Sequence, residues 1–387
     1  MTAKRGNTEE STPLDATIKQ KDPEVKRRDW GKIIKYASLI ILTVQYIGQV
    51  MMLDYSYAVA NKLGNKPAFH KSVVLFFNEM FKLSASLALF SIESKSVIQA
   101  AKNLKVHLFD NFLDFMKVGV VAVIYLIQNV LNIYAVENLK SAQYAVTYQL
   151  KILTTAIFTV TLLGRRLSLI QWISMVVLVA GVALVSIDAI LVKEAAKAAA
   201  LALGANVTTP ASSVDKSTSP IFGFACVLTA CVLSGFAGIY LEKILKTSDV
   251  SIWVRNIQLS LLSIPINFIY MALFERNQIA RLGFMYGFRW NIWVAVGFQA
   301  FGGLVVAVVM KFADNILKAF STSVGIVLIT CLSIPVFARY PTLYFIGGAT
   351  LVITAVVVYS LFPYKKPKSK TEELALQSTS TDGDIEK

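Results

Sequence analysis

Ten stretches of about 20 mostly apolar residues follow one another along this chain of 387 residues. An α-helix rises 1.5 Å per residue, so a stretch of about 20 residues can cross the roughly 30 Å hydrocarbon core of a bilayer. Charged residues make up only 16% of the chain, against about 25% in soluble domains. We therefore predict an all-α membrane protein with ten transmembrane helices. The predicted spans are 33–53, 72–92, 116–136, 142–163, 170–190, 221–241, 252–274, 292–312, 319–338 and 343–362.

The stretch 191–220 divides the predicted spans into two groups of five. It runs from an alanine-rich part into a part rich in Thr, Ser and Pro, which is typical of a linker. An odd number of helices per half makes the halves enter the membrane from opposite sides, as in transporters built from inverted repeats. We predict one transporter domain at 33–362, with halves at 33–190 and 221–362.

The two tails, 1–32 and 363–387, are charged and rich in Ser and Thr, and we predict that both are disordered. Lys and Arg are more frequent on their side of the predicted membrane than on the other, which favours cytosolic termini. The linker then lies on the opposite, lumenal side. It contains the sequence Asn-Val-Thr at 206–208, so Asn206 is a candidate glycosylation site, although such triplets also arise by chance.

Charge and cysteine content argue against several functions. The net charge of +14 is spread over tails and loops and forms no single stripe, so we expect no nucleic acid partner. Cys226, Cys231 and Cys331 lie inside apolar stretches, and His70 and His107 belong to no cluster with metal-ligand spacing. We therefore predict neither an enzyme nor a bound metal or cofactor.

Two lysines occupy matching positions in the two halves. Lys151 and Lys318 each open the fourth span of their half, after a leucine and before small hydroxyl residues. A lysine at the centre of a membrane helix costs about 2.5–3.5 kcal/mol on insertion scales, so such residues usually have a function. The pair predicts a carrier for a negatively charged substrate.

A polar stripe runs along the third predicted span. Tyr125, Gln128, Asn129 and Asn132 are spaced so that they share one face of a helix. This face either lines a cavity or forms hydrogen bonds to neighbouring helices.

Aromatic residues accompany the first lysine. Tyr144 and Tyr148 share a helical face with Lys151, so their rings could stack on a base or a sugar beside the cation. Rings for a base and ammonium groups for phosphates together suit a nucleotide.

Other polar and small residues within the spans have two interpretations. Glu79 and Lys82 are three residues apart and either neutralise each other or take part in gating. Lys311, at the end of the eighth span, either extends to the membrane surface or takes part in gating. The pair Gly302 and Gly303 either permits close helix packing or lets a flat ligand approach the backbone.

Five motifs resemble one known family, the nucleotide-sugar transporters of the Golgi. Within it they resemble the branch that carries UDP-galactose, UDP-N-acetylglucosamine and CMP-sialic acid. The motifs are YAVTYQLK at 144–151, QWI at 171–173, SGFAGIYLEK at 234–243, WVRNIQ at 253–258 and DNILK at 314–318.

The resemblance implies the ten-helix fold of drug/metabolite transporters, with two inverted five-helix repeats. It implies exchange of a cytosolic nucleotide sugar for a lumenal nucleoside monophosphate in the Golgi membrane. The partners expected are a UDP-sugar, UMP, membrane lipid and either a second copy of the chain or a glycosyltransferase. The resemblance places Lys151 and Lys318 at the phosphates. It places Tyr125, Asn129, Tyr144, Ser234 and Asn256 in the nucleotide-sugar cavity.

The choice of substrate depends on Ser260. CMP-sialic acid carriers resemble the stretch around it but have tyrosine at this place, and the smaller serine leaves more room. We therefore favour UDP-galactose or UDP-N-acetylglucosamine, exchanged for UMP. An exchanger of CMP-sialic acid for CMP and a non-transporting membrane scaffold are the alternatives. A scaffold would tolerate the loss of both lysines.

Overall fold

The computed structural model describes residues 22–63, 69–139, 141–202, 219–336, 342–362 and 364. Within these ranges it contains ten helical segments long and apolar enough to cross a membrane, as predicted. They are formed by α2 (Asp22–Lys62), α3 (Lys71–Glu93), α5 (Phe112–Asn138), α6 (Ser141–Tyr148) with α7 (Lys151–Leu163), α8 (Leu169–Ala202), α9 (Pro220–Thr247), α10 (Ile252–Tyr270), α12 (Trp290–Phe312), α13 (Asn315–Val336) and α14 (Leu343–Leu361). The shorter helices are α4 (Val97–Lys105), the π-helices η1 (Val106–Asp110) and η2 (Met271–Glu275), and α11 (Arg276–Leu282).

Two helices extend into the segments predicted as tail and linker. The first, α2, already begins at Asp22, within the tail that was expected to be disordered. The fifth span continues in α8 through the alanine-rich stretch to Ala202, so the first part of the predicted linker is helical. Lys, Glu and Ala dominate 193–202 and are strong helix formers, which explains the extension. The candidate glycosylation site Asn206 lies outside the described residues.

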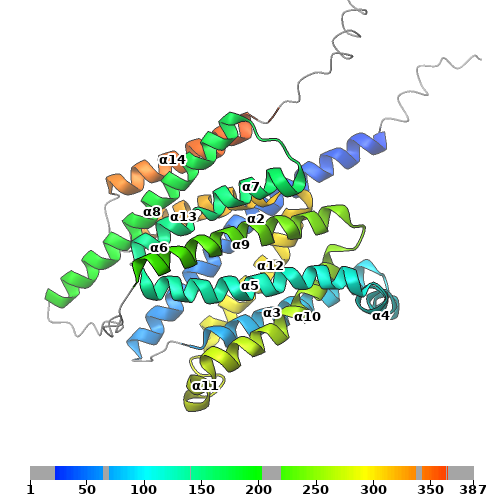
Figure 1. Ribbon diagram of the computed structural model, residues 1–387, viewed down its shortest axis with the longest axis horizontal. Helices are drawn as coiled ribbons and strands as arrows, with labels where there is room; N and C mark the ends of the chain where they lie inside the picture. Colours follow the sequence, from blue (N-terminus) through cyan, green and yellow to red (C-terminus); the bar gives the residue numbers. More distant parts are fainter. Residues whose placement is uncertain are drawn as a thin grey trace, which may run out of the picture.

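The helices form one elongated bundle (Figure 1). The start of the first helix, α2, and the end of α14 lie at the same end of this bundle, next to the loop between α7 and α8. We call this end the terminal face. Because successive spans alternate in direction, α9 ends and α13 begins at the terminal face as well.

Helix packing repeats between the two halves. Each helix in one half has a counterpart five spans later, so α2 corresponds to α9, α5 to α12 and the α6–α7 segment to α13. The contacts follow this correspondence: α5 packs on α9 as α12 packs on α2, and α7 packs on α9 as α13 packs on α2. The pairs α3 with α10 and α8 with α14 each join a helix to its own counterpart. This pattern is the one expected for two repeats related by a twofold axis in the membrane plane.

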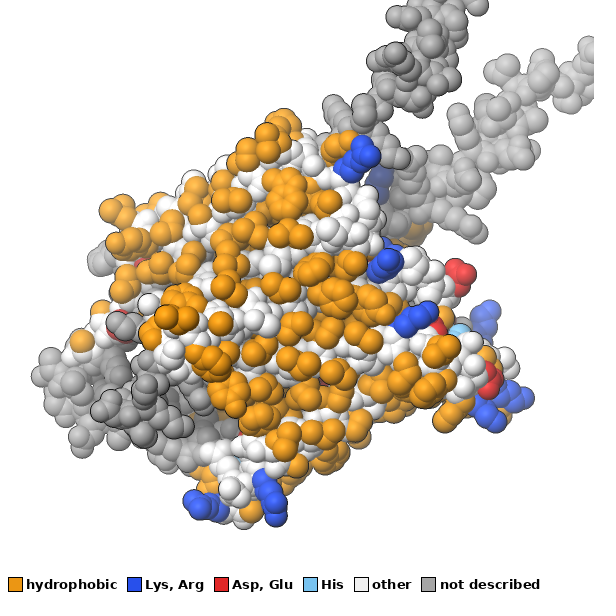
Figure 2. Space-filling view, in the orientation of Figure 1, with side chains coloured by type: hydrophobic (Ala, Val, Ile, Leu, Met, Phe, Trp, Pro, Cys, Tyr) orange, Lys and Arg blue, Asp and Glu red, His pale blue; other side chains and the backbone are white. Residues whose placement is uncertain are grey.

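The surface has the distribution of side chains that a bilayer requires. Figure 2 shows a broad band of apolar side chains across the visible face, with most of its Lys, Arg, Asp and Glu at the ends of the bundle. Exposed apolar residues occur along the spans, including Ile40, Val44, Val123, Val176 and Ile353. The band explains how so many large apolar residues can remain outside the protein core.

Candidate functional site

The fourth span is interrupted immediately before Lys151. Helix α6 ends at Tyr148 and α7 begins at Lys151. Between them, the N–H groups of Gln149 and Leu150 donate to carbonyls three residues back, each at 3.1 Å, and so form a tight turn. Discontinuous helices of this kind place a helix N-terminus, with its partial positive charge, inside the membrane domain. Lys151 therefore lies at the start of a helix that faces the interior of the bundle.

Both lysines line one cavity of about 380 Å³, which we call the central cavity. Its walls come from α2, α5, α6, α7, α9 and α13, and thus from both halves of the chain. This volume is within the range of small-molecule sites. The lining residues are Tyr46, Tyr125, Tyr148, Gln149, Lys151, Ile152, Thr155, Ser234, Gly238, Asn315, Lys318, Ala319, Thr322, Ser323 and Ile326.

Aromatic rings hold the first lysine in place. The Nζ atom of Lys151 lies 4.2 Å from the centre of the Tyr148 ring, a cation–π contact. Tyr144 stacks on Tyr148, with ring centres 5.5 Å apart. The hydroxyl of Tyr148 accepts a hydrogen bond of 3.2 Å from the amide of Gln128, which comes from the polar stripe on α5. The predicted face of α6 and α7 is therefore linked to the predicted face of α5.

The two lysines have matching surroundings. In α7 the hydroxyl of Thr155 donates to the carbonyl of Lys151 at 2.7 Å, and in α13 the hydroxyl of Thr322 donates to the carbonyl of Lys318 at 3.2 Å. Each lysine is thus followed, one helical turn later, by a threonine that also lines the cavity. The similarity noted in the sequence corresponds to a similar local structure.

At α13, protein carboxylates already occupy the helix N-terminus. The N–H of Leu317 donates to Asp314 at 2.7 Å, and the N–H of Asn315 donates to Glu242 at 2.8 Å. These acceptors satisfy backbone groups that could otherwise bind an anion. A negatively charged ligand approaching α13 in the central cavity would therefore meet the ammonium group of Lys318.

Among the described residues, no ion pair involves Lys151 or Lys318. Charged groups in a membrane interior are normally paired, because transfer of an isolated charge from water is costly. Two lysines without a carboxylate partner at one cavity are an arrangement that a ligand with negative charge would stabilise.

A second, smaller cavity of about 230 Å³ adjoins the first at Tyr125, which lines both. We call it the amide chamber, because Asn78, Gln128, Asn129, Asn267 and Gln299 contribute to its walls. The side-chain oxygens of Asn78 and Gln128 are buried and lack a hydrogen-bond partner in the described part of the chain. Buried oxygens without partners are costly, so hydroxyl or N–H groups of a ligand would be favourable here.

Glu79 and Lys82, near this chamber, form an ion pair with each other. The ammonium of Lys82 lies 2.7 Å from the carboxylate of Glu79, and both residues are buried. The side chain of Lys82 also passes over Gly303, where an added Cβ would lie 3.0 Å from it. An added Cβ on the neighbouring Gly302 would overlap the amide of Gln45. The structure thus places protein side chains, not a cavity, against both glycines.

Three further candidates lie away from both cavities. Asn256 is buried and donates to Ile252 of its own helix at 3.2 Å. Ser260 is fully buried, and neither it nor Asn256 lines the central cavity or the amide chamber. Lys311 donates to the carbonyl of Leu245 at 2.7 Å, near the end of α9, where it satisfies the helix terminus.

Several cavity residues were not identified from the sequence. Thr322 and Ser323 belong to the stretch of small hydroxyl residues after Lys318, which in the sequence indicates only that the two halves match. Asn315 lies in the motif DNILK, three residues before Lys318. Tyr46 carries no comparable signal, because a single tyrosine in an apolar span is more often a packing residue.

Comparison with known proteins identifies the family. The profile of the family described as nucleotide-sugar transporter matches residues 31–360. The chain belongs to this family. Its members are transporters and not enzymes, as the sequence predicted.

Similar members of the nucleotide-sugar transporter family have names that state their substrates. The chain is 39% identical to a UDP-galactose translocator of Canis lupus familiaris over 347 residues, which cover 90% of this chain and 81% of the relative. It is 37% identical to a UDP-N-acetylglucosamine transporter of Mus musculus over 333 residues, covering 85% and 96% respectively. It is also 37% identical to a UDP-N-acetylglucosamine/UDP-N-acetylgalactosamine transporter of Caenorhabditis elegans, covering 88% and 98%.

The fold also occurs in a solved crystal structure. That structure covers 86% of this nucleotide-sugar transporter and 97% of its own chain, with a TM-score of 0.59 and 11% sequence identity. At this identity the likeness concerns the fold alone.

Proposed function

We propose that this protein exchanges a UDP-sugar for UMP across a membrane. The observation that carries the proposal is the pair Lys151 and Lys318, which reach one cavity from opposite halves and have no carboxylate partner in the described structure. The relatives named above are transporters of UDP-galactose and of UDP-N-acetylhexosamines, which supports UDP-galactose or UDP-N-acetylglucosamine as the substrate. Ser260 lies outside both cavities, so the relatives and not this residue support the choice of UDP over CMP.

The central cavity and the amide chamber would share the substrate between them. Lys151 and Lys318 would bind the phosphates, since ammonium groups form strong hydrogen bonds to phosphate oxygens. Tyr125 lines both cavities, and Tyr148 carries the stacked ring of Tyr144, so aromatic surface is available for a base or a sugar. Asn129 and its neighbours in the amide chamber would bind hydroxyl or amide groups.

Unpaired positive charge would also enforce exchange. An empty carrier would have to change its conformation with two uncompensated ammonium groups in the membrane interior, which is unfavourable. A nucleotide bound in either direction compensates this charge. The two halves would then rock around the bound ligand and expose it alternately on the two sides of the membrane.

The proposed location is the Golgi membrane, with both termini in the cytosol. In support, the described ends of the chain lie at one terminal face (Figure 1), and the sequence has more Lys and Arg on that side. The UDP-sugar would therefore travel from the cytosol to the lumen, and UMP would travel back.

The substrate assignment is tested by reconstituting the purified chain in vesicles loaded with UMP or with CMP. Uptake of labelled UDP-galactose, UDP-N-acetylglucosamine and CMP-sialic acid is then measured. We expect UDP-sugar uptake that internal UMP stimulates. Uptake of CMP-sialic acid driven by CMP would show that the substrate is CMP-sialic acid, and the exchange mechanism would still hold. If no pair gives uptake, the result would favour the alternative of a non-transporting membrane scaffold.

A further inference from the structure

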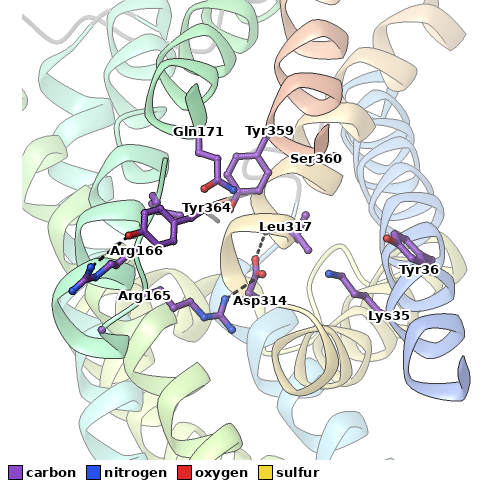
Figure 3. A pocket seen from close by; sticks show the side chains of 12 residues that line it. Lys35, Tyr36, Arg165, Arg166, Gln171, Asp314, Leu317, Tyr359, Ser360 and Tyr364 are labelled. Atoms are coloured by element: carbon purple, nitrogen blue, oxygen red, sulfur yellow. Dashed lines mark hydrogen bonds and ion pairs between the residues drawn. The ribbon is translucent and has the colours of Figure 1, made fainter. Parts of the chain in front are cut away.

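A third cavity, of about 610 Å³, lies at the terminal face and is separate from the two described above (Figure 3). We call it the terminal cavity. Lys35 and Tyr36 of α2, the loop between α7 and α8, the start of α13 and the end of α14 surround it. Neither the predicted phosphate site nor the amide chamber includes any of its residues.

The terminal cavity carries more positive than negative charge. Lys35, Arg165 and Arg166 line it, and among the described residues that line it Asp314 is the one carboxylate. Arg165 lies 3.3 Å from Asp314 and 3.7 Å from Glu242, so protein carboxylates balance its charge. The remaining positive charge belongs to Lys35 and Arg166.

Both of these cations are available to a ligand. Neither Lys35 nor Arg166 forms an ion pair with a carboxylate in the described part of the chain. Among the described residues, the guanidinium of Arg166 donates to the hydroxyl of Tyr364 at 3.4 Å, and the ammonium of Lys35 lies 5.8 Å from the centre of the Tyr36 ring. In Figure 3 the ammonium of Lys35 points into the space that Arg165 and Asp314 reach from the opposite wall.

The remaining lining suits phosphate oxygens. The phenols of Tyr359 and Tyr364 and the amide of Gln171 offer hydrogen-bond donors on one side of the cavity (Figure 3). A guanidinium and an ammonium group with neutral donors beside them are the groups that proteins use to bind phosphate.

The terminal cavity lies beside the central cavity. Asp314 and Leu317 face the terminal cavity, whereas Asn315 and Lys318 face the central cavity, so one turn of α13 separates the two. The ion pair between Arg165 and Asp314 lies at this partition. We infer that the terminal cavity is a second phosphate-binding site, where Lys35 and Arg166 hold phosphate groups at the terminal face, one helical turn from Lys318.

The phosphate could belong to a soluble nucleotide sugar or to the headgroup of a membrane lipid. If the cavity is a waiting site for the transported nucleotide sugar, this role rests on the function proposed above. The binding of phosphate in the cavity does not depend on that function. The first experiment therefore measures binding without transport.

Inorganic pyrophosphate serves as the probe, and the melting temperature of the purified full-length chain is measured at low ionic strength. A ligand that binds only the folded state raises this temperature. In the variant Lys151→Gln/Lys318→Gln, which lacks the central ammonium groups, we expect pyrophosphate to retain a stabilising shift. Adding Lys35→Gln and Arg166→Gln should abolish that shift. The matched control adds Lys102→Gln and Lys243→Gln, which remove two exposed charges outside the cavity and should leave the shift unchanged.

Two results of this experiment would overturn the inference. One is the absence of any shift in Lys151→Gln/Lys318→Gln, provided that the chain still melts cooperatively. The other is a shift that persists after Lys35→Gln and Arg166→Gln are added. Neither result depends on whether the wild-type chain exchanges UDP-sugars for UMP, so the two proposals fail separately.

Transport by Lys35→Gln/Arg166→Gln in two kinds of vesicle then identifies the source of the phosphate. In neutral phosphatidylcholine vesicles, a several-fold higher KM for the nucleotide sugar with unchanged maximal rate assigns the cavity to the soluble substrate. An unchanged KM there, with loss of stimulation by added phosphatidylinositol 4-phosphate, assigns it to a lipid headgroup. A variant equal to the wild type in both kinds of vesicle contradicts a role for the cavity in transport.

Discussion

Arg165 and Asp314 form an ion pair of 3.3 Å that joins the two halves of the transporter at its terminal face. Arg165 belongs to the loop after α7 in the first half, and Asp314 precedes α13 in the second half. Glu242 strengthens the link, because it is completely buried and lies 3.7 Å from Arg165 and 2.6 Å from Lys246. The link lies between the central cavity and the terminal face, where it would oppose opening toward that face.

We predict that Arg165→Gln opens the terminal face more often. A partly exposed ion pair contributes up to about 1 kcal/mol, so the open population should rise roughly two- to fivefold. The measurement is the rate at which an impermeant thiol reagent modifies Thr322→Cys from the cytosolic side of sealed microsomes, in a chain without its three native cysteines. Lys117→Gln, which breaks an ion pair within α5, is the control and should leave the rate unchanged. An equal rate in both variants would show that Arg165 does not restrain opening.

Tyr148 allows the contributions of its ring and its hydroxyl to be separated. Tyr148→Phe keeps the ring below Lys151 and loses the bond to Gln128, whereas Tyr148→Leu loses both. A desolvated cation–π contact contributes about 1–2 kcal/mol, so Leu should weaken UMP binding by roughly 5- to 30-fold and Phe by much less. Calorimetric titration of the purified variants with UMP measures the difference. Equal losses would assign the effect to the hydroxyl and not to the ring.

The contact between α8 and α14 depends on Gly348, and the neighbouring Gly347 provides a matched control position. An added Cβ at Gly348 would lie 2.8 Å from the carbonyl oxygen of Gly181 and 2.9 Å from the backbone nitrogen of Val185, whereas at Gly347 it would meet nothing within 4 Å. We predict that Gly348→Ala lowers stability by about 1–3 kcal/mol, as overpacking does, and that Gly347→Ala does not. The thermal unfolding of the two purified variants decides this. A Gly348→Ala variant as stable as Gly347→Ala would show that the helices adjust without cost.

The spans and part of the central cavity could be predicted because their signals are local in the sequence. Apolar length identified the ten spans, and the cost of a cation in an apolar helix singled out Lys151 and Lys318. Helical spacing placed Tyr148 on the same face as Lys151, and the structure shows the two in contact.

The break in the fourth span could not be predicted, because the turn contains neither glycine nor proline. It is accompanied by contacts from a distant helix. The thiol of Cys231 on α9 lies 3.6 Å from the carbonyl oxygen of Thr147 and 3.5 Å from that of Tyr148. The hydroxyl of Thr154 donates to the backbone carbonyl of Cys231 at 2.7 Å. Such partners, 77 to 84 residues away, are not visible in the local pattern.

The neighbours of the small and polar residues on the other spans could not be predicted from the sequence either. Gly302 and Gly303 were compatible with a ligand or with a neighbouring helix, and only the packed bundle shows Gln45 and Lys82 against them. Ser260 has no sequence feature that reveals whether it faces a cavity, and the fold places it in a buried contact.

The most direct test of the account compares uptake of labelled UDP-sugar into UMP-loaded and empty vesicles, for the wild type and for Lys151→Ala and Lys318→Ala. We predict fast uptake by the wild type only into loaded vesicles. Each variant should lose a charge-assisted contact of about 1.5–3 kcal/mol, which lowers uptake roughly 10- to 150-fold while its melting temperature without ligand stays close to that of the wild type. Equally fast uptake into empty vesicles would contradict exchange, and full uptake by both variants would contradict the assignment of the lysines to the phosphates.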